Sequence, residues 1–314
     1  VAGDGDSPSS LLRDADSAMY HAKRRSGRGG LCVFDAAQRE RSLRRVAIEQ
    51  ALAGAIAGRQ LHLVMQPIVD LHDDGIVAAE VLLRWTHPEL GPIPPAEFVP
   101  LAEDTGAIVD LGGWVLDEAI AQLGRWRADG VVGGAFVLSV NLSGRQLRSD
   151  LPGHVARALR RHDVPARMLT LELTESVILD PSEETTTALA ELRALGVLLA
   201  LDDFGTGWSS LTHLQRTRFD TVKIDRSFVD GLTYQGQDRS IVGAILALGT
   251  SLGVHVVAEG VETRAQRDVL VALGCRYAQG YLFDRPLEPA QFAERMVQPV
   301  PWRSHLRVVG DTMP

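Results

Sequence analysis

Two adjacent carboxylates, Asp202 and Asp203, stand between an apolar run and a glycine-containing turn. The run, VLLAL at 197–201, is short and does not alternate with polar residues, which is typical of a strand buried on both faces. Two ionised carboxylates at the end of such a strand repel each other, and a divalent cation is the usual way to offset that repulsion. The alternative is a pair of aspartates that cap a helix or face solvent.

Further polar residues occupy comparable positions in other apolar runs. They are Glu80, Asn141, Glu172, Lys223, Glu259 and Gln279. Because buried charges without partners are costly, we expect these side chains to meet at one site. Oxygen ligands without His or Cys favour Mg²⁺ or Mn²⁺ over zinc, and two such ions sharing an aspartate could clamp a phosphodiester and activate a water. Lys223 would orient that water, or it would only form a salt bridge with the acids.

The segments that carry these residues predict a barrel. Residues 61–70 and 76–85 are extended runs joined by the turn LHDDG (71–75), which indicates an antiparallel hairpin. Later strands are predicted at 135–142, 168–174, 197–203, 221–225, 254–259 and 277–283. Helical patterns lie at 108–128, 151–162, 183–195, 238–252 and 264–273, and the glycines before three strands are Gly196, Gly253 and Gly274, where helix ends favour positive φ. This order predicts an α/β fold, a TIM-like (β/α)8 barrel with an antiparallel first strand, whose site lies at the carboxyl ends of the strands.

The composition of the chain indicates a folded protein and argues against some functions. The chain of 314 residues is 45% hydrophobic and 23% charged, so it can bury a core, and its net charge of −8 argues against binding of DNA or RNA polymers. Its two cysteines, Cys32 and Cys275, lie far apart, which favours a reduced, cytoplasmic setting. The stretch 241–258 has no Asp, Glu, Lys or Arg, but it contains three glycines and predicts a helix, a turn and a strand. We therefore expect no membrane segment.

The first 58 residues differ in character from the rest. Residues 7–26 have a helical period, 31–35 predict a short strand, and 39–56 predict an arginine-rich helix. This is too little chain for a core of its own, so we interpret it as the end of a preceding domain, 1–36, and a linker helix, 37–58. The barrel is then predicted at 59–299, with a tail at 300–314.

From about Leu61 to Pro286 the chain resembles the EAL family of cyclic di-GMP phosphodiesterases. The matching stretches are MQPIVDL (65–71), EVLLRWTHPELG (80–91), PLAEDTG (100–106), SVNLS (139–143), LELTES (171–176), LDDFGTGWSSL (201–211), KIDRSFV (223–229), AEGVET (258–263) and QGY (279–281). The resemblance implies hydrolysis of cyclic di-GMP to linear pGpG with two Mg²⁺ or Mn²⁺ ions. Residues 11–30 resemble the end of a GGDEF (diguanylate cyclase) domain, but the part that would carry its nucleotide site is absent. The resemblance therefore implies a longer protein with upstream GGDEF and sensor domains, and no cyclase activity is assigned to this chain.

The resemblance also implies roles for individual residues. One ion would be held by Glu80, Asn141, Glu172 and Asp202, and the other by Asp202, Asp203 and Glu259. Among the catalytic residues, Lys223 would contact the attacking water, Glu259 would act as a ligand, and Glu175 would anchor the 203–210 loop. The substrate would be bound by Gln66, Arg84, Asp225 and Gln279, and Arg84 would contact a phosphate. Asp225 and Glu262 would support the ligands from behind.

Some positions depart from the family pattern. Val81 replaces the alanine of the Glu-Ala-Leu signature, but it points away from Glu80 in a strand, so the ligand should survive. Met65, Trp208 and the pair Thr217–Arg218 also differ from common family residues, and none of these changes removes a ligand. Leu211, Leu214 and Phe219 are candidate contacts in a homodimer, although core packing explains them equally well.

Three functions are therefore compared. An active cyclic di-GMP phosphodiesterase is preferred because the ligand set and the DDFGTG loop are intact. The alternative is a non-catalytic cyclic di-GMP receptor or interaction module, which would be expected to lack one of these features. A glycosidase with two carboxylates ranks last, because it leaves Asn141, Lys223 and the Asp202–Asp203 pair unexplained.

Overall fold

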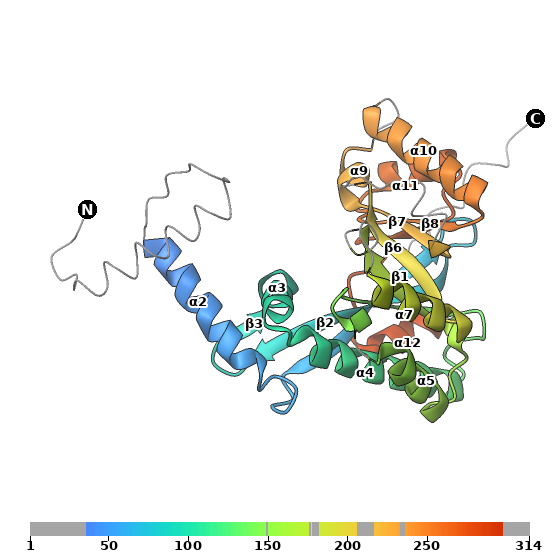
Figure 1. Ribbon diagram of the computed structural model, residues 1–314. Coiled ribbons are helices and arrows are strands. Elements are labelled where there is room, and N and C mark those ends of the chain that lie inside the picture. Colours follow the sequence, from blue (N-terminus) through green and yellow to red (C-terminus); the bar gives the residue numbers. More distant parts are fainter. Residues whose placement is uncertain are drawn as a thin grey trace, which may run out of the picture.

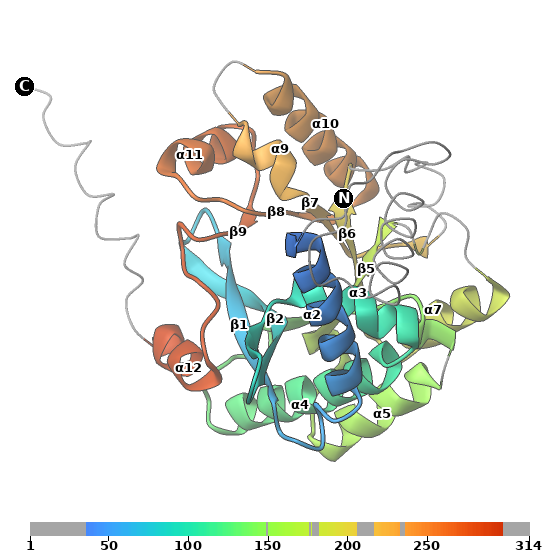
Figure 2. The same cartoon turned by 90° about the vertical axis from the view of Figure 1, so that its left-hand side faces the viewer.

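Eight strands close into a ring in the computed structural model, which describes residues 36–148, 150–175, 177, 182–205, 217–232 and 236–297. The strands are β1 (Leu61–Asp70), β2 (Gly75–His87), β3 (Gly91–Ile93), β4 (Val137–Asn141), β5 (Leu169–Thr174), β6 (Leu198–Phe204), β7 (Thr221–Ile224), β8 (His255–Ala258) and β9 (Tyr277–Gln279). The ring runs β1-β9-β8-β7-β6-β5-β4-β2 and is closed by pairing of β1 with β2 (Figure 2), while β3 extends only β2 (Figure 1). The predicted α/β barrel is confirmed.

The first strand runs against its neighbours. β1 pairs antiparallel with both β2 and β9, whereas all pairs from β2 and β4 round to β9 are parallel. Leu61 at the start of β1 is opposite Trp85 near the end of β2, and Asp70 is opposite Gly75 and Tyr277. The barrel therefore has a mouth, at the carboxyl ends of the parallel strands, and a bottom, where Asp70 lies. The antiparallel first strand agrees with the prediction.

Helices flank the strands: the first two lie beside the outer end of β2, away from the ring, and most of the others cover the ring (Figures 1 and 2). They are α2 (Ala36–Leu52), α3 (Pro95–Thr105), α4 (Ile108–Ala128), α5 (Leu151–Arg161), α7 (Glu183–Ala194), α9 (Arg226–Asp230), α10 (Gln237–Leu252), α11 (Arg264–Ala272) and α12 (Pro289–Val297), with 3-10 turns η1 (Gln146–Arg148) and η2 (Ala166–Met168). Gly253 ends α10 with a φ of 68°, and Gly196 and Gly274 have φ values of 87° and 83°, as predicted for helix ends before strands. None of the helices in the described part of the chain has both the length and the apolar character that crossing a membrane requires.

Three helices were not predicted, and the sequence explains why. Pro95 starts α3 and Pro100 lies inside it, and two prolines so close together argue against a helix even though the first turn tolerates one. α9 has only five residues and depends on Asp225, whose side chain accepts a hydrogen bond from the Ser227 backbone. α12 begins at Pro289, beyond the last predicted strand.

The end of α2 packs into the barrel domain. Ile48 and Leu52 are buried in a small hydrophobic cluster with Trp85, Phe98 and Leu111. This cluster is separate from the main core, which lies between the strands and the outer helices. The rings of Trp85 and Phe98 meet edge to face with centroids 5.4 Å apart. The predicted linker helix at 37–58 thus corresponds to α2 and the turn after it, while the predicted remnant at 1–36 falls almost wholly outside the described residues and the tail at 300–314 entirely so.

Candidate functional site

Lys223 on β7 is the centre of a group of acids at the mouth of the barrel. Its ammonium is 1% exposed and lies 2.6 Å from Glu259, 2.7 Å from Glu172 and 3.3 Å from both Glu80 and Asp202. Burial alone would lower the pKa of Lys223, but the carboxylates, with Glu172 the strongest, raise it well above its ordinary value. Lys223 therefore stays charged and holds together four acids from four strands or strand ends.

Glu80 receives the most complete set of hydrogen bonds. The Asn141 side chain donates to it at 2.6 Å, Gln279 donates at 2.7 Å and Lys223 at 3.3 Å. Burial would raise the pKa of Glu80, but the Lys223 charge and the two amides outweigh it and lower the pKa. The Gln279 amide also donates to Gln66 at 3.0 Å, and Gln66 is the partner of Glu80 in the β1–β2 register. The structure thus brings together five of the residues predicted for the site.

The pKa values of the other three acids, Glu172, Glu259 and Asp203, are raised because these carboxyl groups are buried close to one another. Burial raises the pKa of Glu172 to about 8 and that of Glu259 to about 7, because the attraction of Lys223 does not compensate and nearby carboxylates add repulsion. Burial and Asp202 likewise raise the pKa of Asp203. Four carboxylates share one lysine here, so added positive charge would stabilise the group.

A local irregularity in β6 places its two aspartates together. The register between β6 and β7 shifts between Leu201 and Phe204, and Asp203 has a φ of 55°, in the left-handed region that Asp tolerates. Neighbouring residues of a regular strand point to opposite faces, and a bulge breaks this alternation. As a result, Asp202, Asp203 and Glu259 each offer an oxygen within 4.8 Å of the others.

These oxygens fit a divalent cation. Asp202 Oδ1 is buried and accepts no hydrogen bond from the described residues, although it lies 3.3 Å from Lys223 Nζ. The donors around it are carboxylates and the Asn141 amide, and such oxygen sets suit Mg²⁺ or Mn²⁺ better than softer metals. The acidic group can therefore hold a hard divalent ion.

Three predicted site residues lie at the edge of this group or beyond it. Arg84 is on the same face of β2 as Glu80, and its guanidinium donates to the Leu83 carbonyl at 2.9 Å. Asp225 caps α9 by accepting a hydrogen bond from the Ser227 backbone. The exposed Glu262 forms an ion pair with Arg226 at 3.0 Å. The partners of both acids in these interactions are therefore not predicted metal ligands. Their predicted supporting roles stay predictions.

Glu175 follows β5 and is buried. Both of its carboxylate oxygens lack a hydrogen-bond partner in the described part of the chain. The loop that it is predicted to anchor is described only as far as Gly205, so the anchor role stays a prediction. Leu211, Leu214 and Trp208 also fall outside the described residues, whereas Phe219 is buried in the main core.

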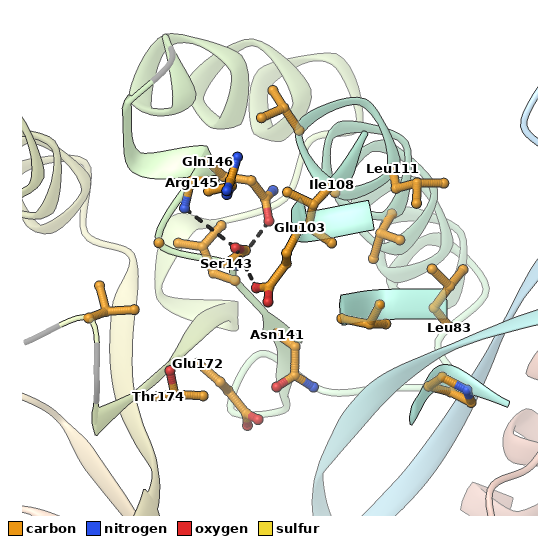
Figure 3. A pocket seen from close by; sticks show the side chains of 18 of the residues that line it. Leu83, Glu103, Ile108, Leu111, Asn141, Ser143, Arg145, Gln146, Glu172 and Thr174 are labelled. Atoms are coloured by element: carbon orange, nitrogen blue, oxygen red, sulfur yellow. Dashed lines mark hydrogen bonds between the residues drawn. The ribbon is translucent and has the colours of Figure 1, made fainter. Parts of the chain in front are cut away.

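Sequence reasoning missed a network beside the site. Ser143 donates to Glu103 at 2.8 Å, and its backbone N–H donates to Gln146 at 3.0 Å, so the chain just after Asn141 is fixed from two sides (Figure 3). A cavity of about 1070 Å³ adjoins this network and reaches Asn141 and Glu172 (Figure 3). Glu103 and Ser143 belong to the PLAEDTG and SVNLS stretches, so only their membership of a motif could have indicated them.

Fold and site together define an α/β barrel with an antiparallel first strand and a mouth able to hold a divalent cation. The family model described as the EAL domain matches residues 49–286, and the chain belongs to this family.

Relatives and solved structures agree with this assignment. The chain is 42% identical over 290 residues to the bifunctional diguanylate cyclase/cyclic di-GMP phosphodiesterase MucR of Pseudomonas aeruginosa, covering 92% of this chain and 42% of MucR. It is 39% identical over 234 residues to cyclic di-GMP phosphodiesterase PA2567 of the same species, covering 74% of this chain and 39% of the relative. The chain thus spans about two fifths of the length of these curated relatives.

Two solved structures are similar along most of the chain. The PaMucR phosphodiesterase in complex with c-di-GMP has a TM-score of 0.74 and 42% identity, covering 78% of this chain and 99% of that one. The EAL enzyme Bd1971, in its form bound to cAMP and cyclic-di-GMP, has a TM-score of 0.77 and 29% identity, covering 93% and 77%.

Proposed function

We propose that this EAL domain is a metal-dependent phosphodiesterase that hydrolyses cyclic di-GMP to linear pGpG. The observation that carries the proposal is the fully buried Lys223 among four carboxylates, next to the three-acid group of Asp202, Asp203 and Glu259. Relatives with about 40% identity carry this activity in their names, and one of them is solved with c-di-GMP.

Two divalent ions, Mg²⁺ or Mn²⁺, would occupy the mouth. Glu80, Asn141, Glu172 and Asp202 would hold one ion, and Asp202, Asp203 and Glu259 the other. Bound ions would supply a water of lowered pKa and a clamp on the attacked phosphodiester.

The residues of the chain would bind and orient the substrate around this centre. Lys223 can donate to the attacking water, because its charge is maintained by the surrounding acids. Arg84 lies four residues beyond Glu80 on the same face of β2 and can pair with a phosphate oxygen. Gln279 holds Glu80 and Gln66 in place by donating to both, so its loss would disturb a ligand and the substrate side together.

Hydrolysis of cyclic di-GMP tests the proposal. The wild type and the variants Glu80→Ala and Lys223→Ala are assayed for pGpG with Mg²⁺ or Mn²⁺, after circular dichroism has shown that all are folded. Asp74→Asn is the matched control, because Asp74 pairs with Arg267 at 3.1 Å in the β1–β2 turn, at the bottom of the barrel. We expect turnover in the wild type and control and its loss in both mouth variants. Binding of cyclic di-GMP without turnover in either metal would instead support a non-catalytic receptor.

We also propose a wider setting for the domain. A cytoplasmic location rests on the two widely separated cysteines, of which Cys275 is buried as a thiol. Upstream GGDEF and sensor domains rest on the resemblance of residues 11–30 and on the greater length of the relatives. A homodimer is expected from the family resemblance, and light scattering at micromolar concentration checks it: a monomer with full activity would contradict it.

A further inference from the structure

The carboxyl end of β4 is paired with only one of its two neighbouring strands. Asn141, the last residue of β4, is opposite Glu172 in the β4–β5 register, and the backbone N–H of Leu142 donates to the Glu172 carbonyl at 2.8 Å. On the other side, the β2–β4 register ends one residue earlier, where Val81 is opposite Val140. Asn141 therefore lies where strand pairing continues on the β5 side but has ended on the β2 side.

Ser143, two residues after Asn141, joins this end of β4 to two helical segments (Figure 3). Its hydroxyl donates to the Glu103 carboxylate at 2.8 Å, and its backbone N–H donates to the Gln146 side chain at 3.0 Å. Gln146 is 2% exposed, and its amide packs so closely on α4 that no room remains for a Cβ at Gly112. Ser143 is thus held from η1 through Gln146 and from α3 through Glu103.

The Glu103 carboxylate is placed for this hydrogen bond and has no basic partner. Glu103 is half-buried on the last turn of α3, a helix that is fixed to the barrel domain by residues such as the buried Leu101. In the described part of the chain it forms no ion pair, whereas the neighbouring Asp104 pairs with Arg45 at 3.0 Å. A carboxylate acceptor strengthens a hydrogen bond from a hydroxyl, so the contact that Glu103 makes with Ser143 is a strong one.

The Asn141 amide must keep one direction to bind an ion. Its nitrogen donates to Glu80 at 2.6 Å, so its oxygen is the atom left for a cation. The Asn141 side chain is exposed, so its direction depends on the bond to Glu80 and on the backbone that carries it. Metal ligands are held in place by the groups behind them, and these groups contribute to metal affinity.

We propose that Glu103 is a positioning residue for the metal centre, which acts through Ser143 on Asn141. This role rests on the proposed function, because that function makes Asn141 a ligand of one of the two ions. By accepting the Ser143 hydrogen bond, Glu103 keeps the end of β4 where the Asn141 oxygen reaches the ion that it shares with Glu80. The ion of the three-acid group does not use Asn141, so only one of the two ions depends on Glu103.

Mn²⁺ binding to Glu103→Ala and Glu103→Gln tests this role. We expect Glu103→Ala to weaken one ion about 10-fold and to leave the other within about 3-fold of the wild type. Glu103→Gln should bind both ions within about 3-fold of the wild type, because its amide oxygen still accepts the Ser143 hydrogen bond. Electron paramagnetic resonance of the metal-free chain during titration measures both affinities. A glutamine variant as weak as the alanine variant would mean that the charge of Glu103 acts on the ions, and would overturn the proposal.

A double-mutant cycle shows whether the two residues act through their shared bond. We expect Ser143→Ala to weaken the same ion to a similar degree as Glu103→Ala. The double variant should bind this ion no more weakly than either single variant, because each substitution removes the same hydrogen bond. Additive losses would mean that the two side chains act separately, and would overturn the proposal.

Asp104→Asn is the matched control. It changes the acid next to Glu103 on α3 and removes the charge that pairs with Arg45, but it leaves the bond to Ser143 in place. Both Mn²⁺ affinities should therefore stay at the wild-type values. Equal weakening in Asp104→Asn and Glu103→Ala would mean that any change at the end of α3 disturbs the site, and would overturn the positioning role.

Turnover at several Mn²⁺ concentrations separates the two possible failures. Hydrolysis of cyclic di-GMP by Glu103→Ala should be reduced at limiting Mn²⁺ and should recover to within about 3-fold of the wild type at saturating Mn²⁺, with an unchanged KM for cyclic di-GMP. A wild type that binds two ions and turns over, with Glu103→Ala indistinguishable from it, would overturn the positioning role alone. A wild type that binds no Mn²⁺ would overturn the proposed function, and the positioning role with it.

Discussion

Acids at the two ends of the barrel meet opposite conditions. At the bottom, Asp70 accepts hydrogen bonds from the His72 backbone at 2.9 Å and from Arg276 at 2.8 Å, and although burial would raise its pKa these partners lower it. At the mouth, Glu172 and Glu259 have raised pKa values of about 8 and about 7. The partners of Asp70 thus favour its charged form, whereas Glu172 and Glu259 at the mouth carry negative charge that a bound cation could offset.

The difference lies in the ratio of acids to partners. Asp220, just before β7, likewise has its own donors, the Leu199 backbone at 2.9 Å and Arg193 at 3.2 Å. At the mouth, four acids share the single ammonium of Lys223, and Glu80 also accepts hydrogen bonds from Asn141 and Gln279. We therefore expect substitutions at the mouth to affect turnover and substitutions at the bottom to affect stability, and the following predictions could break that division.

The largest effect is expected for Asp202→Asn at the mouth. Asp202 is the residue that both ions would share, so its loss should reduce turnover of cyclic di-GMP by at least about 10³-fold. Asp70→Asn at the bottom should change turnover by less than about 3-fold, since its hydrogen-bond partners in the described chain, His72 and Arg276, lie outside the site. Steady-state kinetics with saturating Mn²⁺ measures turnover in both variants. Similar losses in the two would contradict the expectation that only the mouth acids act in turnover.

The two ends should also respond to pH with opposite sign when metal is chelated. Burial raises the folded pKa of Glu172 from its ordinary 4.5 to about 8, so the folded state binds protons more tightly than the unfolded state in this range. Stability should therefore fall as pH rises from 5 to 8, by on the order of 3 kcal/mol. Urea unfolding in the presence of a chelator measures the slope, and Glu172→Gln should flatten it; an unchanged slope in that variant would contradict the assignment.

Asp70 should act in the reverse direction. Its folded pKa is lowered, so its contribution is present above its unfolded pKa and is lost as pH falls through the folded value. Asp70→Asn at pH 7 should cost about 1–3 kcal/mol, because a buried charged hydrogen bond is lost. Urea unfolding gives this value, and a variant as stable as the wild type would show that the bottom pair is not stabilising.

The smallest effect is expected for a substitution in the middle of β2, between the mouth and the bottom of the barrel. Val81 is 2% exposed and points into the core rather than toward Glu80, so Val81→Ala removes two methyl groups from a packed site. It should cost about 1–2 kcal/mol of stability and change kcat by less than about 3-fold. A large rise in kcat would instead mean that the valine holds back the ligand beside it.

Much of the fold was predictable because it repeats. Alternating apolar strands and helices set the barrel, and the predicted helix at 108–128 has the observed bounds of α4. The hairpin turn at 71–75 set the antiparallel first strand. The small helices α3 and α9 were missed because prolines and a single capping aspartate carry too little pattern.

The site was predictable as a set but not as a geometry. Positions at strand ends indicated the acids around Lys223, since such ends converge in a barrel. The bulge that turns Asp203 toward Glu259 depends on a local register shift, and the Ser143–Glu103 bond joins residues 40 positions apart. Such contacts arise only after the helices have packed, so no spacing rule reveals them.

Mn²⁺ binding to the metal-free chain tests the central claim most directly. Titration followed by electron paramagnetic resonance counts the ions bound per chain in the wild type, in Asp202→Asn and in Asp70→Asn. We expect two bound ions for the wild type and Asp70→Asn, and weakened or lost binding for Asp202→Asn. A wild type that binds no Mn²⁺, or an Asp202→Asn variant that binds it as the wild type does, would contradict the role of the mouth acids.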